Sequence, residues 1–186
     1  MDSLLPPLTA ILDAEVASRA GWPVIDLARA FLAGGARFLQ IRAKQASSAW
    51  LLETSSAIVA LAKSVGASVV VNDRADIARL SDAGGVHLGQ EDLDPVSARV
   101  IVGPDAVVGL STHTLEQVDA ALGLPVSYLA IGPVFGTPTK STGYSAIGLD
   151  MVTRAASRVR HLGLPLVAIG GITLETAADV MRAGAS

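Results

Sequence analysis

A polar loop that follows a short apolar segment carries residues that could hold a phosphate group. Tyr128–Ile131 is apolar and suits a strand, and the Gly-Pro pair after it ends that strand. Thr137, Thr139 and Lys140 then place two hydroxyls, several free amides and one ammonium in one loop, and such groups together form phosphate-binding loops. A Thr/Pro turn with a solvated lysine would have the same composition, so this segment alone leaves both interpretations open.

Five further groups of polar or glycine residues follow apolar segments in the same way. They are Gln40, Arg42 and Lys44; Asn72 and Asp73; Gln90, Glu91 and Asp92; Ser111, Thr112 and His113; and Gly170 with Gly171. A single aspartate at such a place commonly caps a helix, and a single lysine commonly lies in solvent. Polar groups after six successive segments favour a functional site instead.

The apolar segments predict seven strands that alternate with seven helices. The predicted strands are Leu8–Asp13, Ala36–Ile41, Ser68–Val71, Gly85–Leu88, Ala106–Leu110, Tyr128–Ile131 and Leu166–Ile169. The predicted helices are Val24–Ala33, one from Ser47 or Ser48 to Lys63, Ala75–Leu80, one that begins at Asp94-Pro95, Val118–Leu122, Leu149–Leu162 and one from Thr173 to Arg182. Thr114 and Gln117 predict a capping box before the fifth of these helices.

Most of these strands are continuous apolar runs, which is typical of a parallel sheet that is buried on both faces. A doubly wound open sheet commonly carries a GxGxxG turn after its first strand, and the segment after Leu8–Asp13 has none. The sequence therefore predicts an α/β fold of the (β/α)8 TIM-barrel type. In such barrels the residues that perform the chemistry follow the carboxyl ends of the strands, as the polar groups do here.

Composition limits the class of protein. The chain has 186 residues, of which 51% are hydrophobic and 17% charged, and it predicts one ordered domain over residues 1–186. A net charge of −3 offers no basic face for nucleic acid. The sequence contains no cysteine, no apolar run of the roughly 18 residues that a membrane-spanning helix needs, and no secretory signal pattern at its start. We therefore expect a cytoplasmic protein with neither nucleic acid nor a membrane as its partner.

Six blocks of the sequence together resemble the thiamine phosphate synthase family. They are QIRAK (Gln40–Lys44), VND (Val71–Asp73), HLGQED (His87–Asp92), GLSTHT (Gly109–Thr114), GPVFGTPTK (Gly132–Lys140) and AIGGI (Ala168–Ile172). They occur in the family's order and approximate spacing. The resemblance implies a transferase that joins an aminopyrimidine-methyl diphosphate to a thiazole phosphate, with thiamine phosphate and diphosphate as products.

The residue types agree with that reaction. Asp73 and Asp92 follow neighbouring predicted strands, and Mg²⁺ commonly takes one or two carboxylates together with substrate phosphate oxygens. Arg42 can bind phosphate oxygens in bidentate fashion, and Lys44 and Lys140 add positive charge for the diphosphate that leaves. We therefore expect Mg²⁺-assisted loss of diphosphate, and the resemblance implies that this loss is dissociative and that the thiazole nitrogen traps the resulting cation without a base.

The resemblance also implies a role for each site residue. The expected catalytic residues are Arg42, Lys44, Ser111 and Lys140. The expected substrate-binding residues are Gln40, Ile41, Arg42, Ala43, Lys44, Asn72, Ser111, Thr137, Pro138, Thr139, Lys140 and Gly171. Within this set Gln40 would orient the pyrimidine, Asn72 and Ser111 would contact the diphosphate, and Thr137–Thr139 with Gly171 would hold the thiazole phosphate.

The pattern departs from the family at the end of the chain. Earlier Gly-Ala pairs precede a strand, whereas the pair at Gly184-Ala185 is followed only by Ser186. We therefore expect a barrel that lacks its eighth βα unit, with an incomplete thiazole-phosphate site and unpaired edges on the first and seventh strands. A homo-oligomer is one arrangement that would cover these edges.

Three alternatives remain open at this point. A thiazole tautomerase-like relative would bind similar ligands without the full set of metal and diphosphate residues. A Schiff-base aldolase would use a lysine near the sixth strand, although Lys140 lies in the loop eight residues beyond Gly132. A non-catalytic barrel that binds a phosphate ligand is the third. Among the histidines, we expect His87 to lie in the core, His161 to lie on the surface and His113 to have no assigned function.

Overall fold

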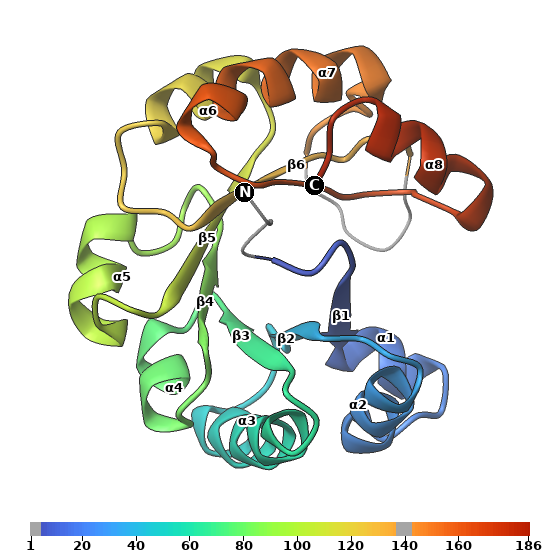
Figure 1. Ribbon diagram of the computed structural model, residues 1–186. Coiled ribbons are helices and arrows are strands. Elements are labelled where there is room, and N and C mark those ends of the chain that lie inside the picture. Colours follow the sequence, from blue (N-terminus) through green and yellow to red (C-terminus); the bar gives the residue numbers. More distant parts are fainter. Residues whose placement is uncertain (1–4, 137–142) are drawn as a thin grey trace. The chain divides into compact units, whose positions relative to one another are not determined.

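The computed structural model describes residues 5–136 and 143–186, and it confirms the predicted fold class (Figure 1). Among these residues seven strands follow one another in the sheet in chain order, from β1 to β7, and helices connect them. The strands are β1 (Thr9–Asp13), β2 (Phe38–Arg42), β3 (Ser68–Asn72), β4 (Gly85–Leu88), β5 (Val107–Thr112), β6 (Tyr128–Ile131) and β7 (Leu166–Ala168). The helices are α1 (Ala14–Arg19), α2 (Val24–Ala33), α3 (Ser48–Lys63), α4 (Ala75–Leu80), α5 (Pro95–Val102), α6 (Leu115–Ala121), α7 (Gly148–Val159), the 3₁₀ turn η1 (Arg160–Leu162) and α8 (Leu174–Arg182).

The chain forms two compact units, and all of β1–β4 belongs to one of them. This unit, called the β1–β4 unit, comprises residues 6–88 and 92–108. Its strands pair in parallel, and the register places Asp13 opposite Arg42. Helices α2, α3 and α4 lie along the outside of these strands (Figure 1). Leu12, Phe38 and Leu39 are fully buried, as expected for strands covered by helices.

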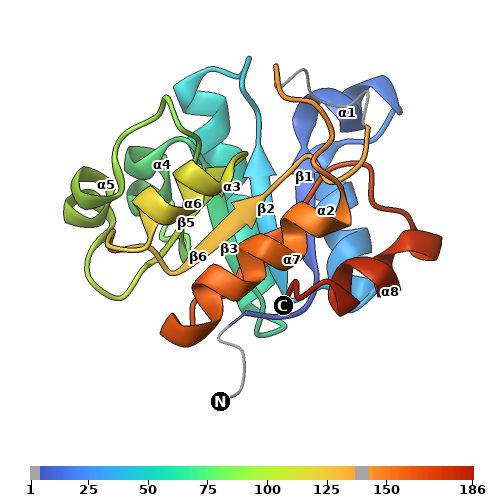
Figure 2. The ribbon, with the colours of Figure 1, turned by 90° about the horizontal axis from the view of Figure 1, so that it is seen from above.

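The second unit, called the β5–β7 unit, comprises residues 1–5, 89–91 and 109–186. Parallel pairing joins β5 to β6 and β6 to β7, and α6 and α7 lie next to each other along β6 (Figure 2). Gly109 lies opposite Tyr128 in the register. A Cβ atom at residue 109 would lie 2.2 Å from a carbon of the Tyr128 ring, so only glycine leaves room for this buried aromatic side chain.

Several helix starts follow the caps that the sequence predicts. The Asp94 side chain accepts hydrogen bonds from the N–H groups of Val96 and Ser97, at 3.0 and 3.1 Å, and thereby starts α5. Ser47 caps α3 by accepting from Trp50 N. Thr173 caps α8, where its N–H donates to the Thr176 hydroxyl at 2.9 Å.

Several local predictions were wrong in part. The capping box at Thr114 is only half formed: Thr114 accepts from Gln117 N, but the Gln117 side chain accepts from His113 N rather than from Thr114 N. Strands β1, β2, β3, β5 and β7 begin or end one or two residues away from the predicted bounds; β2, β3 and β5 extend further because their last residues are polar and were not counted as strand. Helix α6 begins at Leu115, three residues before the predicted start at Val118. The short helix α1, which directly follows β1, was not predicted at all.

The sheet order begins with β1 and ends with β7, as expected for a barrel pattern with seven strands. Among the described residues, β1 pairs with β2 and β7 pairs with β6. Ser186 N donates to Leu166 O, and Leu166 N donates to the Ser186 hydroxyl, each at 3.0 Å.

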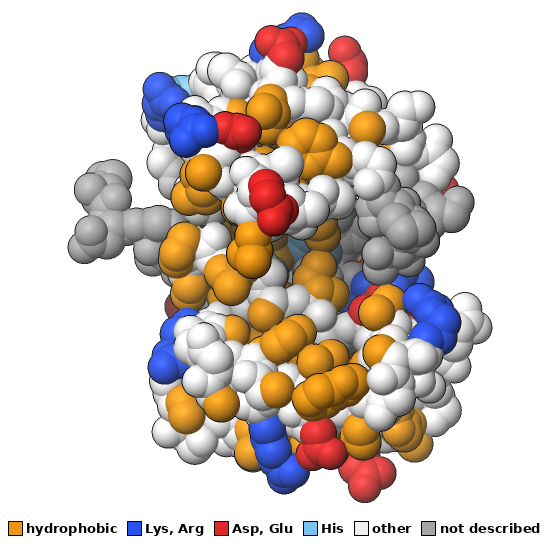
Figure 3. Space-filling view, turned by 90° about the vertical axis from the view of Figure 1, so that its right-hand side faces the viewer, with side chains coloured by type: hydrophobic (Ala, Val, Ile, Leu, Met, Phe, Trp, Pro, Cys, Tyr) orange, Lys and Arg blue, Asp and Glu red, His pale blue; other side chains and the backbone are white. Residues whose placement is uncertain are grey.

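Figure 3 shows hydrophobic side chains on the face that carries α8, where Leu174 and Met181 are exposed. None of the described helices is long and apolar enough to cross a lipid bilayer.

Candidate functional site

Lys44 and Asp73, two predicted site residues from adjacent strands of the β1–β4 unit, form an ion pair. The Lys44 Nζ atom lies 3.0 Å from Asp73 Oδ2. Asp73 comes directly after β3 and has a left-handed backbone, with φ of 64°. Its N–H donates to His87 O at 2.7 Å, which fixes this unusual conformation against β4. The structure therefore brings one proposed metal ligand and one proposed diphosphate ligand together.

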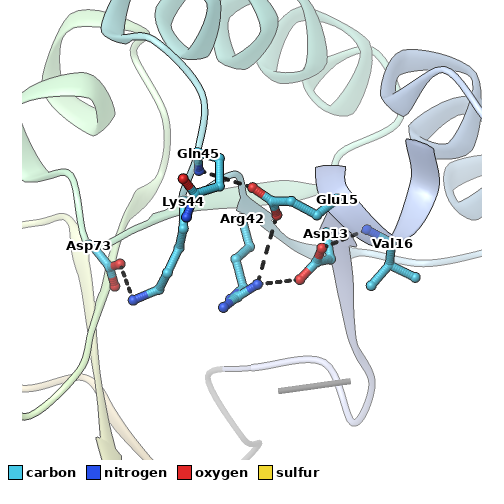
Figure 4. A network of polar contacts seen from close by, with 7 residues as sticks. All are labelled: Asp13, Glu15, Val16, Arg42, Lys44, Gln45 and Asp73. Carbon is cyan, nitrogen blue, oxygen red and sulfur yellow. Dashed lines mark hydrogen bonds and ion pairs between the residues drawn. The ribbon is translucent and has the colours of Figure 1, made fainter. Parts of the chain in front are cut away.

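Arg42 ends β2 and lies beside two carboxylates at the end of β1 (Figure 4). Its Nη1 atom donates a hydrogen bond to Asp13 Oδ2 and lies 3.9 Å from Glu15 Oε2. The side chains of Arg42 and Asp13 are only 17% and 11% exposed, so their charges are largely removed from water. Arg42 and Lys44 point to the same side of the end of β2 (Figure 4), as two ligands of one anion would.

The sequence analysis missed both carboxylates because it missed α1. Asp13 is the N-cap of α1 and accepts a hydrogen bond from Val16 N at 2.9 Å. Glu15 lies in the first turn of the same helix, where the helix dipole favours a negative charge. An aspartate followed two residues later by a glutamate is a recognisable start of a helix, and this signal in the segment DAEV could have located both residues.

The Asp13 carboxyl group has a depressed pKa. Burial opposes its ionised form, but the hydrogen bond from Val16 N and the hydrogen bond and charge of Arg42 together outweigh burial, so the pKa lies below its ordinary value. A depressed pKa means that this carboxylate stabilises the fold at pH values above the unfolded-state pKa of about 3.9. This contribution is lost as the pH falls through the folded-state pKa.

Replacement of Asp13 tests that pH dependence. Asp13→Asn retains an N-cap oxygen for Val16 N but removes the charge that faces Arg42. We expect the free energy of unfolding of the wild type to fall as the pH is lowered from 6 to 3, mainly below about pH 4, and that of the variant to fall less steeply. Urea titrations at several pH values would measure both curves. Parallel curves would contradict the linkage between Asp13 ionisation and stability.

The other predicted residues of the β1–β4 unit differ in how their side chains are placed. Gln40, Ile41 and Ala43 are buried. Asn72 ends β3 and is half-buried. Asp92 lies in the loop between β4 and α5 and is also half-buried.

Ser111 and its neighbours in β5 belong to the β5–β7 unit. The Ser111 carbonyl oxygen accepts a hydrogen bond from Gln90 Nε2 at 2.6 Å, which holds the loop after β4 against the end of β5. His113 Nδ1 lies 2.6 Å from Gly132 O, and because a carbonyl oxygen can only accept, Nδ1 carries the proton. The His113 ring also stacks on Tyr144, with ring centroids 4.0 Å apart. His113 therefore connects the ends of β5 and β6 to the segment that begins α7.

Gly171 lies at a close approach between two backbone segments of the β5–β7 unit. Its φ is +64°, and a Cβ atom at this position would lie 2.6 Å from Gly136 O. Phe135 N donates to Gly170 O at 2.9 Å, so the end of β7 runs against the segment that leads to residue 137. Thr137, Pro138, Thr139 and Lys140, four of the predicted site residues, lie outside the described residues.

The donor atoms at the end of β3 suit a hard cation. Asp73 offers carboxylate oxygens and already has a cation, Lys44 Nζ, as its partner. Among residues 5–136 and 143–186 no cluster of three or more His, Cys, Asp or Glu side chains is arranged to bind a metal. Such an arrangement is compatible with the predicted magnesium site, because only two protein carboxylates, Asp73 and Asp92, were expected there. Where only one or two carboxylates bind Mg²⁺, water and substrate phosphate oxygens commonly supply the remaining ligands.

Comparisons with known proteins agree with the sequence resemblance. The family described as "Thiamine monophosphate synthase" matches residues 8–186. A thiamine-phosphate synthase of Azorhizobium caulinodans is 38% identical over 179 residues, which cover 96% of this chain and 82% of that protein. A thiamine-phosphate synthase of Anaeromyxobacter dehalogenans is 45% identical over 159 residues, which cover 86% of this chain and 70% of that protein.

Solved structures give the same result. A thiamine phosphate pyrophosphorylase of Pyrococcus furiosus superposes with a TM-score of 0.83 at 32% identity, over 95% of this chain and 81% of that one. A structure described as native KDPGal superposes with a TM-score of 0.64 at 20% identity, which indicates a shared fold alone. The predicted family and the prediction of an enzyme are therefore confirmed, and the chain belongs to the thiamine monophosphate synthase family.

Proposed function

We propose that this member of the family condenses an aminopyrimidine-methyl diphosphate with a thiazole phosphate through Mg²⁺-assisted loss of diphosphate. The observation that carries the proposal is the Lys44–Asp73 pair beside Arg42 in the β1–β4 unit. It places two cations that suit phosphate oxygens next to a carboxylate that suits a hard metal ion.

The charges of this group of residues support a requirement for metal. Arg42 and Lys44 contribute two positive charges, whereas Asp13, Glu15 and Asp73 contribute three negative ones. The group therefore has no excess of positive charge with which to bind a diphosphate. Asp73 and Asp92 would hold the Mg²⁺, which when bound neutralises charge on the diphosphate oxygens and so favours its departure.

In the proposed reaction the bond between the pyrimidine methylene carbon and the diphosphate oxygen breaks, and its electron pair leaves with the diphosphate. Arg42 and Lys44 stabilise the negative charge that grows on that oxygen. Gln40 orients the pyrimidine, and Asn72 and Ser111 contact the diphosphate. The lone pair of the thiazole nitrogen then forms the new C–N bond, and no proton has to be removed. Lys140, the Thr137–Thr139 segment and Gly171 are assigned to the phosphate groups.

An assay with both phosphorylated substrates tests this proposal. We expect thiamine phosphate and diphosphate in equal amounts, and only when both substrates and Mg²⁺ are present. The charge of the site does not suffice to release diphosphate without Mg²⁺, and no nucleophile of the protein takes the place of the thiazole in the proposed reaction. Chromatography of the products, with and without a chelator, would measure both. Full activity in the chelator would contradict the metal assignment, and turnover of the thiazole compound alone would favour a tautomerase-like activity.

A further inference from the structure

Glu15 makes two contacts that converge on the segment assigned to diphosphate. Its Oε1 atom accepts a hydrogen bond from the backbone N–H of Gln45 at 3.0 Å. Its Oε2 atom is buried, has no hydrogen-bond partner among the described residues and lies 3.9 Å from Arg42 Nη1. One carboxylate thus contacts both ends of the segment from Arg42 to Gln45, which carries Lys44 between them (Figure 4).

The hydrogen bond to Gln45 matters because the segment from Ala43 onward has left the sheet. Strand β2 ends at Arg42, so ladder hydrogen bonds to β1 and β3 no longer fix the backbone that follows. Residues 44 and 45 lie in a turn before Ser47, the cap of α3. The hydrogen bond from Gln45 N to Glu15 ties this turn to α1 across 30 positions of sequence. It thereby limits where the Lys44 backbone can lie relative to Asp73.

We propose that Glu15 is a positioning residue, which holds the Ala43–Gln45 turn through the Gln45 N–H and so places Lys44 for diphosphate. This inference rests on the proposed function, which assigns Lys44 to the diphosphate. Glu15 does not itself bind the anion, because its negative charge would repel it. Its Oε1 oxygen is the atom that acts, and an amide oxygen could replace it.

Two substitutions separate the hydrogen bond from the charge. Glu15→Gln keeps an oxygen that can accept from Gln45 N but removes the negative charge beside Arg42. Glu15→Ala removes both. Asp26→Ala is the matched control, because Asp26 lies on α2 of the same unit and pairs with the exposed Arg29, away from the diphosphate residues.

The measured quantity is the Kd for inorganic diphosphate in the presence of Mg²⁺, obtained by calorimetric titration of the full chain. We expect Glu15→Ala to raise this Kd about tenfold, since a hydrogen bond to a charged group is lost. Glu15→Gln should bind as tightly as the wild type or more tightly, because a repulsive charge is gone. Asp26→Ala should bind as the wild type does, and melting curves would confirm that all four proteins are folded at the temperature of the titration.

Three results would overturn the inference: a Glu15→Ala protein with the affinity of the wild type, a Glu15→Gln protein as weak as Glu15→Ala, or a wild type that does not bind diphosphate. Failure of the proposed function looks different. In that case the wild type would bind diphosphate with Mg²⁺ and show the Glu15→Ala defect, yet form no thiamine phosphate from the two substrates.

Discussion

Replacement of Asp73 by asparagine is expected to lower kcat/KM about a thousandfold, which corresponds to a loss of about 4 kcal/mol of transition-state stabilisation from a weakened metal site. The substitution removes the charge that would hold Mg²⁺ and that now pairs with Lys44. It preserves the backbone, because asparagine tolerates the left-handed φ of 64° as aspartate does. Steady-state rates over a range of Mg²⁺ concentrations would measure the effect.

Asp82 provides a closely matched control for Asp73. It also has a left-handed backbone, with φ of 57°, and its carboxylate also pairs with a lysine, Lys63, in the same unit. Asp82 is exposed on the surface and no site role is assigned to it. Asp82→Asn should leave kcat/KM within about twofold of the wild type, as expected for a surface ion pair. If Asp73→Asn behaved in the same way, with an unchanged Mg²⁺ requirement, Asp73 would not be a metal ligand.

Arg42→Met should destabilise the protein by about 3 kcal/mol and also abolish diphosphate binding. The methionine side chain can occupy the space of the arginine stem, so packing is largely preserved. Asp13, however, keeps a negative charge that is only 11% exposed and loses the guanidinium that neutralises it. Denaturant unfolding would measure the loss of stability, and diphosphate titration would measure the loss of binding.

A second substitution distinguishes these two losses. In the double variant Asp13→Asn/Arg42→Met the buried negative charge of Asp13 is removed, while its cap of α1 is kept. We expect the double variant to regain most of the lost stability but none of the diphosphate binding, because the interaction between neighbouring residues makes their effects non-additive. Equal instability of the single and double variants would show that the loss comes from packing rather than from the unpaired charge.

Most of the fold could be predicted because its signals are local. Continuous apolar runs and glycine or proline boundaries located all seven strands, and α2, α4, β4 and β6 have the predicted bounds. Helix α1 was missed because it follows β1 without a loop, so no turn residues separate the strand from the helix. Its sequence, AEVASR, has no large apolar residue other than Val16, so it shows no apolar periodicity, and the aspartate cap is the signal that indicates it.

The candidate site was predictable to a smaller extent. Polar residues after six of the seven strands predicted that Arg42, Lys44 and Asp73 lie at one edge of the sheet, because carboxyl ends of parallel strands meet there. The sequence could not indicate that Lys44 pairs with Asp73 or that Asp13 pairs with Arg42, because such pairs depend on the register between strands. Glu15 was missed for the additional reason that it accepts a hydrogen bond from a backbone N–H. Every residue except proline has this group, so the sequence does not indicate which residue is the partner.

The contacts of Arg42 and Gln45 restrict in different ways which substitutions these positions can accept. Arg42 and Asp13 meet through their side chains, so a change in one alone leaves a buried charge, and related sequences should keep both or exchange both together. Gln45 meets Glu15 through its main chain, so position 45 should accept almost any residue that retains an N–H. Proline is the exception, because it has no N–H to donate. A survey of relatives should therefore find covariation between positions 13 and 42, and wide variety without proline at position 45.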